Sequence, residues 1–257
     1  MTHLSVNLNK IGLLRNSRGR DYPNMLTMAQ RTLELGAFGI TIHPRPDQRH
    51  ATYRDAYDLK ELLKQYPGRE LNIEGFPDTK FLEVVLEVEP DQCTLVPDDP
   101  NQLTSDHGWN IGRDQDALRP VIAKLQEKGI RVVLFMDPVA ENMALAKSVG
   151  ADRVELYTEA YANAYPTDQR EQVNATYQEA AQAALDAGLG VNAGHDLDLE
   201  NVGLLCGEKR ITEVSIGHAL TVEALEFGWD KVVKKYLEQL ALAKPRNACI
   251  AHTVTIH

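Results

Sequence analysis

Short apolar runs recur along the chain, with polar or turn-forming residues between them. Eight runs stand out, at residues 4–8, 40–42, 71–74, 93–96, 132–136, 154–157, 190–192 and 214–216. Most are too continuous for a strand with one polar face, so they predict strands that are buried on both faces. Between the runs, apolar residues follow a helical period, and one such stripe is formed by Val173, Tyr177, Ala180, Ala181 and Ala184.

The junctions from helix to strand share one pattern. In LELGAFGITIH, QEKGIRVVLF, KSVGADRVELY and LDAGLGVNAGH, a helical pattern ends, a glycine follows, and an apolar run begins within a few residues. Glycine is favoured just after a helix because it adopts the left-handed conformation at little cost. The four glycines are Gly36, Gly129, Gly150 and Gly188. This repetition predicts a repeated strand–helix unit.

The number of repeats predicts an α/β fold. Eight units in 257 residues leave about 32 residues for each, the size of a βα repeat, and match a (β/α)8 TIM barrel. A doubly wound open sheet uses the same local pattern and remains the alternative, although no GxGxxG follows the first run. We expect one barrel domain over residues 1–243 and a C-terminal tail over residues 244–257.

Two helix starts are predicted from capping residues. Asp137 followed by Pro138 has the composition of an N-cap and a first helical residue. Thr221, shortly after the last apolar run, is a second expected N-cap.

The charge balance and the cysteines exclude several classes of protein. The chain carries 27 Lys and Arg against 37 Asp and Glu, a net charge of −10, which argues against a nucleic-acid partner. No apolar run reaches the length of a membrane span, about 18 residues, and the N-terminus has no long apolar signal segment. Cys93, Cys206 and Cys249 are odd in number and widely spaced, so we expect a cytoplasmic protein without a disulfide framework or a zinc site.

Candidate acid–base residues lie where the predicted strands end, which is where the active site of such a barrel forms. His43, His195 and His218 follow three different runs, and Glu74 ends the run LNIE. Histidine titrates near neutral pH and can both accept and donate protons, and burial raises the pKa of a carboxyl toward that range. The structural alternatives are histidines hydrogen-bonded into strand ends and a Glu74 paired with an arginine.

Basic residues gather in the loops after the first two runs. The segments RNSRGR and HPRPDQRH carry Arg15, Arg18, Arg20, Arg45, Arg49 and His50. Forked arginine donors match phosphate, so this clustering beside His43 predicts an anion site. Any single one of these arginines could still be an ordinary solvated charge.

A second anion site is predicted after the last run. The segment SIGHAL places Gly217 and His218 at a strand end, just before an expected helix. The loops after strands seven and eight, with a helix N-terminus, form the common phosphate site of such barrels. Two anion sites beside acid–base groups predict a lyase, an isomerase or a condensing enzyme acting on phosphorylated carbonyl compounds.

The blocks that carry these residues resemble the pyridoxine 5′-phosphate synthase family. They are VNLNKIGLLRNSRG, GITIHPRPDQRH, LNIEG, TLVPDD, VNAGHDL and SIGHAL, in the family's order, within a resemblance that runs from Leu4 to Leu240. The resemblance implies a barrel with extra helices, a cytoplasmic homo-octamer and a transferase of vitamin B6 biosynthesis. The implied reaction condenses 1-deoxy-D-xylulose 5-phosphate with 3-amino-2-oxopropyl phosphate to pyridoxine 5′-phosphate, phosphate and water, with no cofactor and no metal.

The resemblance also implies roles for individual residues. His43 matches the first catalytic base, Glu74 the second base, and His195 the proton donor. The matched substrate-binding positions are Asn7, Asn9, Lys10, Arg18, Arg45, His50, Thr104, Asp196, Gly217 and His218. Among these, Arg45 and His50 would hold the phosphate that leaves, and Gly217 with His218 the phosphate of the amino ketone.

The chain departs from the family pattern at three places. Many members have Asp-His where this chain has Asn9-Lys10, Gly where it has Asp196, and Gly-Arg where it has Val222-Glu223. The acid–base triplet is intact, so we expect the same reaction.

Three other functions remain open at this stage. Lys10 could form a Schiff base, as in class I aldolases. His43, His195 and His218 could hold the metal of a hydrolase, although Asn7-Leu8-Asn9 stands where such barrels often have His-x-His. A non-catalytic sugar-phosphate sensor is a third possibility, which the retained acid–base residues disfavour.

Overall fold

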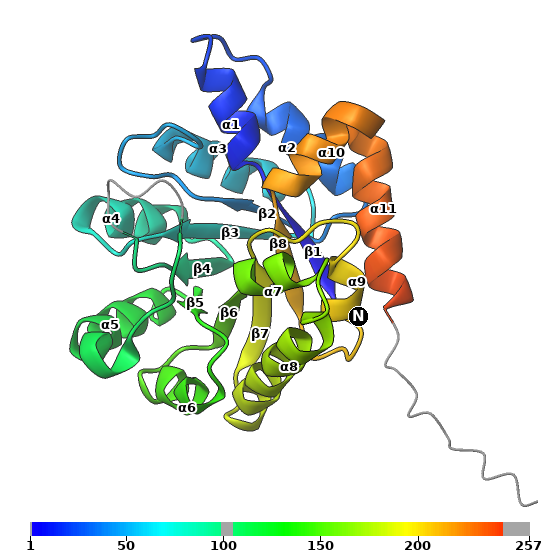
Figure 1. The fold of residues 1–257 in the computed structure, drawn as a ribbon. Helices are drawn as coiled ribbons and strands as arrows, with labels where there is room; N and C mark the ends of the chain where they lie inside the picture. Colours follow the sequence, from blue (N-terminus) through cyan, green and yellow to red (C-terminus); the bar gives the residue numbers. More distant parts are fainter. Residues whose placement is uncertain (1, 99–104, 244–257) are drawn as a thin grey trace, which may run out of the picture.

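All eight predicted strands form, and they close a parallel barrel in this computed structural model, which describes residues 2–98 and 105–243 (Figure 1). The strands pair in chain order, and β1 pairs with both β2 and β8. The (β/α)8 barrel is therefore confirmed, and the open-sheet alternative is wrong. The strands are β1 (His3–Asn7), β2 (Gly39–Ile42), β3 (Glu70–Gly75), β4 (Gln92–Leu95), β5 (Arg131–Met136), β6 (Arg153–Tyr157), β7 (Gly190–Gly194) and β8 (Glu213–Ile216).

Helices surround the barrel, and some of them are additional to the simple repeat (Figure 1). Helix α1 projects beyond the body of the barrel, α7 is a short insertion before α8, and α10 and α11 both follow β8. The helices are α1 (Asn9–Asn16), α2 (Met25–Glu34), α3 (Tyr53–Leu63), α4 (Thr79–Val88), α5 (Ile111–Gln126), α6 (Ala140–Ser148), α7 (Glu159–Ala164), α8 (Arg170–Asp186), α9 (Val202–Leu205), α10 (His218–Phe227) and α11 (Trp229–Leu242).

The predicted glycine junctions turn the chain from helix into strand. Gly36, Gly129, Gly150 and Gly188 have φ of 110°, 74°, 103° and 74°. These values lie in the left-handed region that other residues adopt only with strain. Each glycine lies two or three residues after the end of a helix and precedes a strand, as the sequence pattern predicts.

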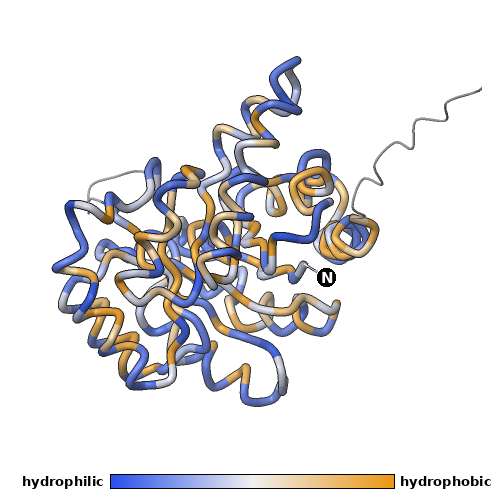
Figure 2. Tube along the Cα trace, turned by 90° about the horizontal axis from the view of Figure 1, so that it is seen from below, coloured by the Kyte–Doolittle hydropathy of each residue, from blue (hydrophilic) through white to orange (hydrophobic). Residues whose placement is uncertain are grey.

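The main hydrophobic core lies between the barrel and the helices. Alternate strand residues such as Leu4, Val6, Leu71 and Ile73 face the helices, and hydrophobic residues gather there (Figure 2). The predicted helical stripe is confirmed, since Tyr177, Ala180, Ala181 and Ala184 of α8 are buried and Val173 packs against the same core.

The inside of the barrel is polar, which the sequence reading did not anticipate. Such barrels are usually filled by layers of branched apolar side chains. Here Ser5 hydrogen-bonds Thr41 (2.7 Å), Thr94 donates to Asn72 (3.1 Å), and all four side chains are buried. The runs are therefore buried on both faces, as predicted, but their inward positions carry hydrogen-bonding groups.

The two predicted helix starts differ from the observed ones. Helix α6 begins at Ala140, because the Asp137 carboxylate accepts the backbone N–H of Gly108 (3.1 Å) rather than capping a helix at Pro138. Helix α10 begins at His218, and the Thr221 hydroxyl donates to the carbonyl of Gly217 (2.8 Å) from within it.

The last described helix, α11, ends at Leu242, so the predicted tail over residues 244–257 lies outside the described residues. Within the described part of the chain, every helix is too short or too polar to cross a membrane.

Candidate active site at the barrel mouth

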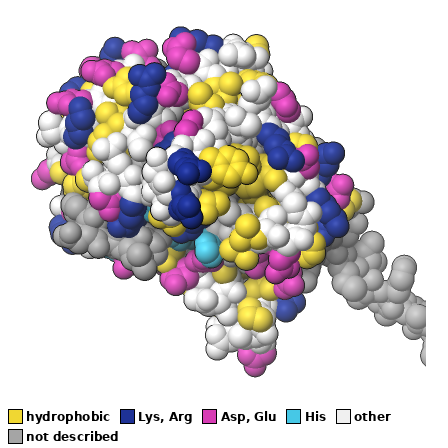
Figure 3. All heavy atoms as spheres, turned by 90° about the horizontal axis from the view of Figure 1, so that it is seen from above, with side chains coloured by type: hydrophobic (Ala, Val, Ile, Leu, Met, Phe, Trp, Pro, Cys, Tyr) yellow, Lys and Arg dark blue, Asp and Glu magenta, His cyan; other side chains and the backbone are white. Residues whose placement is uncertain are grey.

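A cavity of about 520 Å³ opens where the strands end, and nearly all predicted site residues line it. On the face seen from above, a histidine lies beside basic side chains (Figure 3). The predicted residues that line the cavity are Asn7, Asn9, Lys10, His43, Arg45, His50, Glu74, His195, Asp196, Gly217 and His218.

Several residues of the predicted anion cluster are not brought to this cavity. Arg18 and Arg20 are exposed after α1 and do not line it. Thr104 lies outside the described residues. Arg15, expected in the anion cluster, forms instead a two-pronged pair with Asp55 at the start of α3 (2.6 and 2.8 Å). Asp55 also completes a capping box with Thr52, so this pair joins α1 to α3 and belongs to the scaffold.

Two carboxyl groups, Glu74 on β3 and Glu155 on β6, line the mouth. Asn7 donates to Glu74 Oε2 (3.4 Å). Glu155 is 3% exposed, and its Oε2 has no hydrogen-bond partner among the described residues. Burial raises the pKa of both, and the negative charge of Asp98 raises that of Glu74 further, as the charge of Glu74 does for Glu155. With its pKa raised to about 8, Glu74 can therefore hold and release a proton near neutral pH.

The sequence places Glu155 among the strand-end residues but indicates no role for it. The run RVELY carries a carboxylate inside a buried strand, as LNIEG does for Glu74. The face on which this carboxylate lies depends on the strand register. The register pairs Glu155 with Phe135 on one side and with Asn192 on the other.

His43 is buried just after the end of β2, and a hydrogen bond to Asn9 fixes its backbone. Its backbone N–H donates to Asn9 Oδ1 (2.8 Å), and Asn9 N–H donates in turn to Asn7 Oδ1 (3.0 Å). Burial, and then the charge of Arg45, lowers the pKa of His43 well below its ordinary value. The imidazole is therefore neutral at physiological pH and can accept a proton.

His195 stands on a strained backbone at the end of β7. His195 has φ of 85° and Asp196 of 54°, in the left-handed region that non-glycine residues seldom adopt. The Thr158 hydroxyl donates to the carbonyl of Gly194 (2.6 Å) and also to that of His195. Burial lowers the pKa of His195, although the carboxylates of Asp196 and Asp98 oppose this. The imidazole lies edge-on to Tyr157, with ring centroids 5.2 Å apart.

A basic rim of Lys10, Arg45, Arg49 and His50 forms the side of the cavity near β1 and β2. Burial, and then the charges of Lys10 and Arg49, lowers the pKa of His50 to about 4. His50 is therefore neutral in this rim. The fixed cations Lys10, Arg45 and Arg49 give the rim its positive charge, which suits an anion.

The N-terminus of α10 forms the second anion-binding feature. Its first residues, Gly217, His218 and Ala219, line the cavity. The unpaired N–H groups of a helix start attract anions. A Cβ on Gly217 would lie 2.9 Å from both the Cβ and the carbonyl oxygen of Asn7, so the approach of these two strand ends requires glycine.

The three departures from the family pattern have separate outcomes. Asn9 and Lys10 both line the mouth, and Asn9 positions His43 through its side-chain oxygen. Asp196 adopts a conformation in which glycine would be relaxed. Glu223 is turned away from the mouth, since it accepts from Tyr236 (2.6 Å) and from the backbone of Leu199 (3.1 Å).

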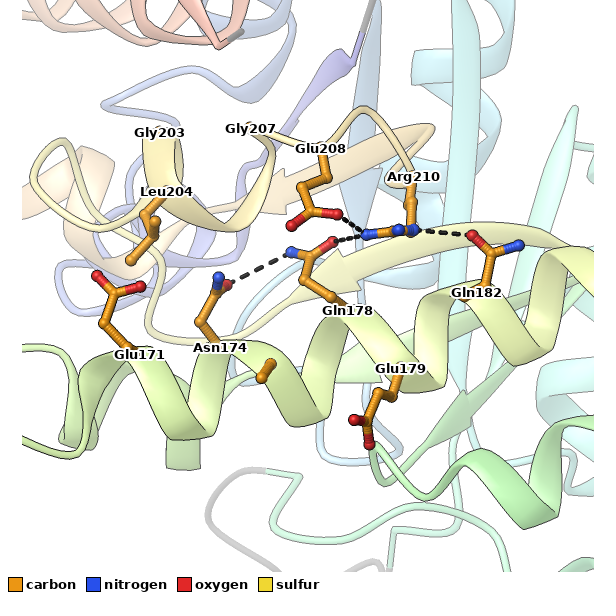
Figure 4. A pocket seen from close by; sticks show the side chains of 11 residues that line it. Glu171, Asn174, Gln178, Glu179, Gln182, Gly203, Leu204, Gly207, Glu208 and Arg210 are labelled. Atoms are coloured by element: carbon orange, nitrogen blue, oxygen red, sulfur yellow. Dashed lines mark hydrogen bonds and ion pairs between the residues drawn. The ribbon is translucent and has the colours of Figure 1, made fainter. Parts of the chain in front are cut away.

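A second hollow of about 550 Å³ lies outside the barrel, between α8 and the segment around α9 (Figure 4). Its cation, Arg210, is bound by Glu208, by Gln182 (2.9 Å) and by Gln178 (3.2 Å). Among the described residues, the buried side-chain atoms that lack a partner are His50 Nδ1, Asp98 Oδ1 and Glu155 Oε2, all at or beside the mouth. Unsatisfied buried polar groups mark functional sites, so the mouth is the stronger candidate.

The histidines at the mouth do not form a metal site in the described part of the chain, where no group of three His, Cys, Asp or Glu residues is placed to hold a metal ion.

Comparison with known proteins identifies close relatives. The family profile described as "Pyridoxal phosphate biosynthesis protein PdxJ" matches residues 4–242. The chain is 48% identical over 241 residues to the pyridoxine 5′-phosphate synthase of Flavobacterium johnsoniae, covering 93% of this chain and 100% of that one. It is 46% identical over 242 residues to the enzyme of the same name from Brucella abortus, covering 93% and 98%.

Solved structures of low sequence identity share the barrel. A 4-hydroxy-2-oxoglutarate aldolase/2-deydro-3-deoxyphosphogluconate aldolase from TTHB1 superposes with a TM-score of 0.60 at 15% identity, over 92% of this chain and 93% of that one. A phosphoribosyl anthranilate isomerase does so with a TM-score of 0.58 at 14% identity, over 94% and 99%. At these identities the similarity concerns the fold alone.

Proposed function

Because this chain belongs to the PdxJ family and is an enzyme of vitamin B6 biosynthesis, we propose that it condenses 1-deoxy-D-xylulose 5-phosphate with 3-amino-2-oxopropyl phosphate. The products are pyridoxine 5′-phosphate, inorganic phosphate and water. One observation carries this proposal: a single cavity contains two anion-binding features, and acid–base groups lie among them. A substrate pair with one phosphate each matches that arrangement.

The phosphate groups of the two substrates bind at different anion-binding features. The basic rim with Arg45 and His50 binds the phosphate of the sugar, which leaves during the reaction. The start of α10, with Gly217 and His218, binds the phosphate of the amino ketone, which the product retains. Forked arginine donors and a helix N-terminus are both suited to phosphate.

The reaction needs several proton transfers, because an amine adds to a ketone, phosphate and water leave, and a ring closes by an aldol-type step. His43, neutral because of burial, accepts the proton released as the amine adds. Glu74 removes a carbon-bound proton, and its raised pKa makes it a stronger base when ionised. His195 donates protons to leaving oxygens. Glu155, protonated in its buried setting, transfers a proton to an oxygen that gains negative charge.

A direct assay tests this function. Purified protein is incubated with both substrates, and pyridoxine 5′-phosphate and inorganic phosphate are measured together. We expect the two products in equal amounts, and neither when one substrate is omitted. Well-folded protein that forms no pyridoxine 5′-phosphate would contradict the proposal. Borohydride treatment with substrate tests the Schiff-base alternative, in which Lys10 would become labelled.

The family resemblance also supports a cytoplasmic homo-octamer. Leu13 and Leu14 of α1, and Leu225 and Phe227 of α10, are apolar and exposed in the single chain. Burial of such surface between subunits is favourable. Light scattering after gel filtration is expected to give eight times the 28.7 kDa of the chain, and a monomer would contradict this part of the proposal.

A further inference from the structure

Asp98 contacts Arg45 of the basic rim and takes part in none of the proposed proton transfers. It follows β4 in the segment TLVPDD and is 3% exposed. Its Oδ2 accepts from Arg45 Nη2 (2.6 Å) and from Ser105 Oγ (2.8 Å). Its other oxygen, Oδ1, is buried and has no partner among the described residues.

Arg45 lies between Asp98 and the mouth. It lines the mouth cavity together with Lys10 and His50. It also lines a small hollow of about 20 Å³, whose wall includes Asp98. Asp98 itself does not line the mouth, but both side chains bonded to it, Arg45 and Ser105, do. Of the two, Arg45 carries the charge that binds an anion.

The pair differs from a second, largely buried Arg–Asp pair in the described part of the chain, that of Arg15 and Asp55. In that pair both carboxylate oxygens accept from the guanidinium, and Asp55 also accepts from Thr52. In the pair of Arg45 and Asp98, only Oδ2 of Asp98 accepts hydrogen bonds from the described residues. A buried carboxylate with one unsatisfied oxygen is costly to maintain, and scaffold stability alone does not require it.

We propose that Asp98 is the positioning residue for Arg45, holding its guanidinium from behind so that it meets the phosphate of the sugar substrate in one fixed orientation. A flexible arginine loses rotamer freedom when it binds an anion, and a buried carboxylate that has already fixed it lowers that cost. Ser105 holds the same oxygen of Asp98 and so fixes the pair in turn. The identity of the phosphate rests on the proposed function, whereas the positioning of Arg45 does not.

The substitution Asp98→Asn keeps the shape and removes the charge. We expect the KM for 1-deoxy-D-xylulose 5-phosphate to rise roughly tenfold, the size expected for one charged hydrogen bond. The kcat and the KM for 3-amino-2-oxopropyl phosphate should stay within about threefold, since other groups set them. Asp98→Glu restores the charge and should recover most of the loss. Ser105→Ala, a milder change, should raise the same KM by a smaller factor.

Asp55→Asn is the matched control, because it breaks a buried Arg–Asp pair that does not line the mouth. It should lower the melting temperature and leave both KM values unchanged. If Asp98→Asn only lowers the melting temperature, or raises both KM values equally, Asp98 is structural and the proposal is wrong.

Titration with inorganic phosphate separates this proposal from the proposed function, because it needs no turnover. Wild-type protein should bind phosphate at two sites, and Asp98→Asn should weaken one of them roughly tenfold. If wild type forms no pyridoxine 5′-phosphate but Asp98→Asn still weakens one phosphate site, the proposed function fails and the role of Asp98 stands. Unchanged phosphate binding in Asp98→Asn would overturn that role.

Discussion

Buried carboxyl groups lie both at the mouth of the barrel and at its floor, the opposite end where the strands begin, but their surroundings differ: Glu213 at the floor is paired with an arginine, whereas Glu155 at the mouth pairs with none in the described part of the chain. At the floor, Glu213 lies 3.3 Å from Arg153 and accepts from Gln92 (3.3 Å), and Arg131 binds Glu70 (2.7 Å). At the mouth, Glu155 has an oxygen without any partner among the described residues. Arg153 and Glu155 are two positions apart on one strand and face the same interior.

This difference in pairing separates buried carboxyls that stabilise the fold from buried carboxyls that take part in the reaction. A buried ion pair with further hydrogen bonds fixes side chains, whereas an unpaired carboxyl keeps a raised pKa and a readily transferred proton. Burial raises the pKa of Glu213 to about 7 even though Arg153 opposes it. Burial, and then the negative charges of Glu74 and Glu213, raise the pKa of Glu155 well above its ordinary value.

The largest expected effect is the loss of turnover in Glu74→Gln. The amide cannot accept the proton, so kcat should fall by at least about 10³-fold, while the KM of each substrate changes little. Steady-state kinetics with both substrates, and circular dichroism to confirm folding, provide the measurement. Turnover within tenfold of wild type would show that Glu74 is not a base.

At the floor, Arg153→Met should affect stability more than chemistry. The substitution leaves Glu213 buried without its cation, which costs about 3–5 kcal/mol of unfolding free energy. Urea denaturation measures the loss, and kcat per folded molecule should remain within about threefold of wild type. If Arg153→Met were as stable as wild type but inactive, the floor would take part in the reaction, and the roles assigned to mouth and floor would be wrong.

The raised pKa of Glu155 fixes the sign of its contribution to the pH dependence of stability. Since the pKa of Glu155 is raised in the folded protein, the folded state binds more protons than the unfolded state above the ordinary carboxyl pKa, and its stability falls as pH rises. Glu155→Gln removes this dependence. Its stability relative to wild type should rise between pH 5 and pH 9, by about 1–3 kcal/mol. Denaturation curves at pH 5 and pH 9 give the difference in unfolding free energy between Glu155→Gln and wild type. An equal difference at the two pH values would contradict the prediction.

A smaller effect is expected for Gly217→Ala. The new Cβ would press on Asn7, 2.9 Å away, and shift the start of α10. We expect a roughly tenfold higher KM for 3-amino-2-oxopropyl phosphate and little change for the sugar phosphate. Gly112→Ala on α5, where the added Cβ meets only Asn110 Oδ1 at 3.5 Å, is the control. Equal effects of both alanines would count against the assigned phosphate site.

The fold could be predicted from the sequence because its signals are local. Continuous apolar runs and the glycines after helices, such as Gly129 and Gly188, act within a few residues. Most of the candidate site could also be predicted, since strand ends meet at one mouth and the family blocks carry His43, Glu74 and His195.

The remaining features depend on contacts between distant residues. Arg15 pairs with Asp55, which is 40 residues away, and no local pattern separates this arginine from Arg18 in the same segment. Glu155 lies in a strand-end run, but that its Oε2 is buried without a partner among the described residues depends on contacts that no local pattern shows. The helix start at His218 was missed because Thr221 has the composition of a cap but bonds backward to Gly217.

The central claim is that the mouth carboxyls perform proton transfer while the floor carboxyls hold the barrel together. The most direct test compares kcat for Glu155→Gln and Glu213→Gln, the same substitution at the two ends of one interior. We predict a loss of about 10²-fold at the mouth and a change within about threefold at the floor. Equal losses, or a larger loss in Glu213→Gln, would contradict the claim.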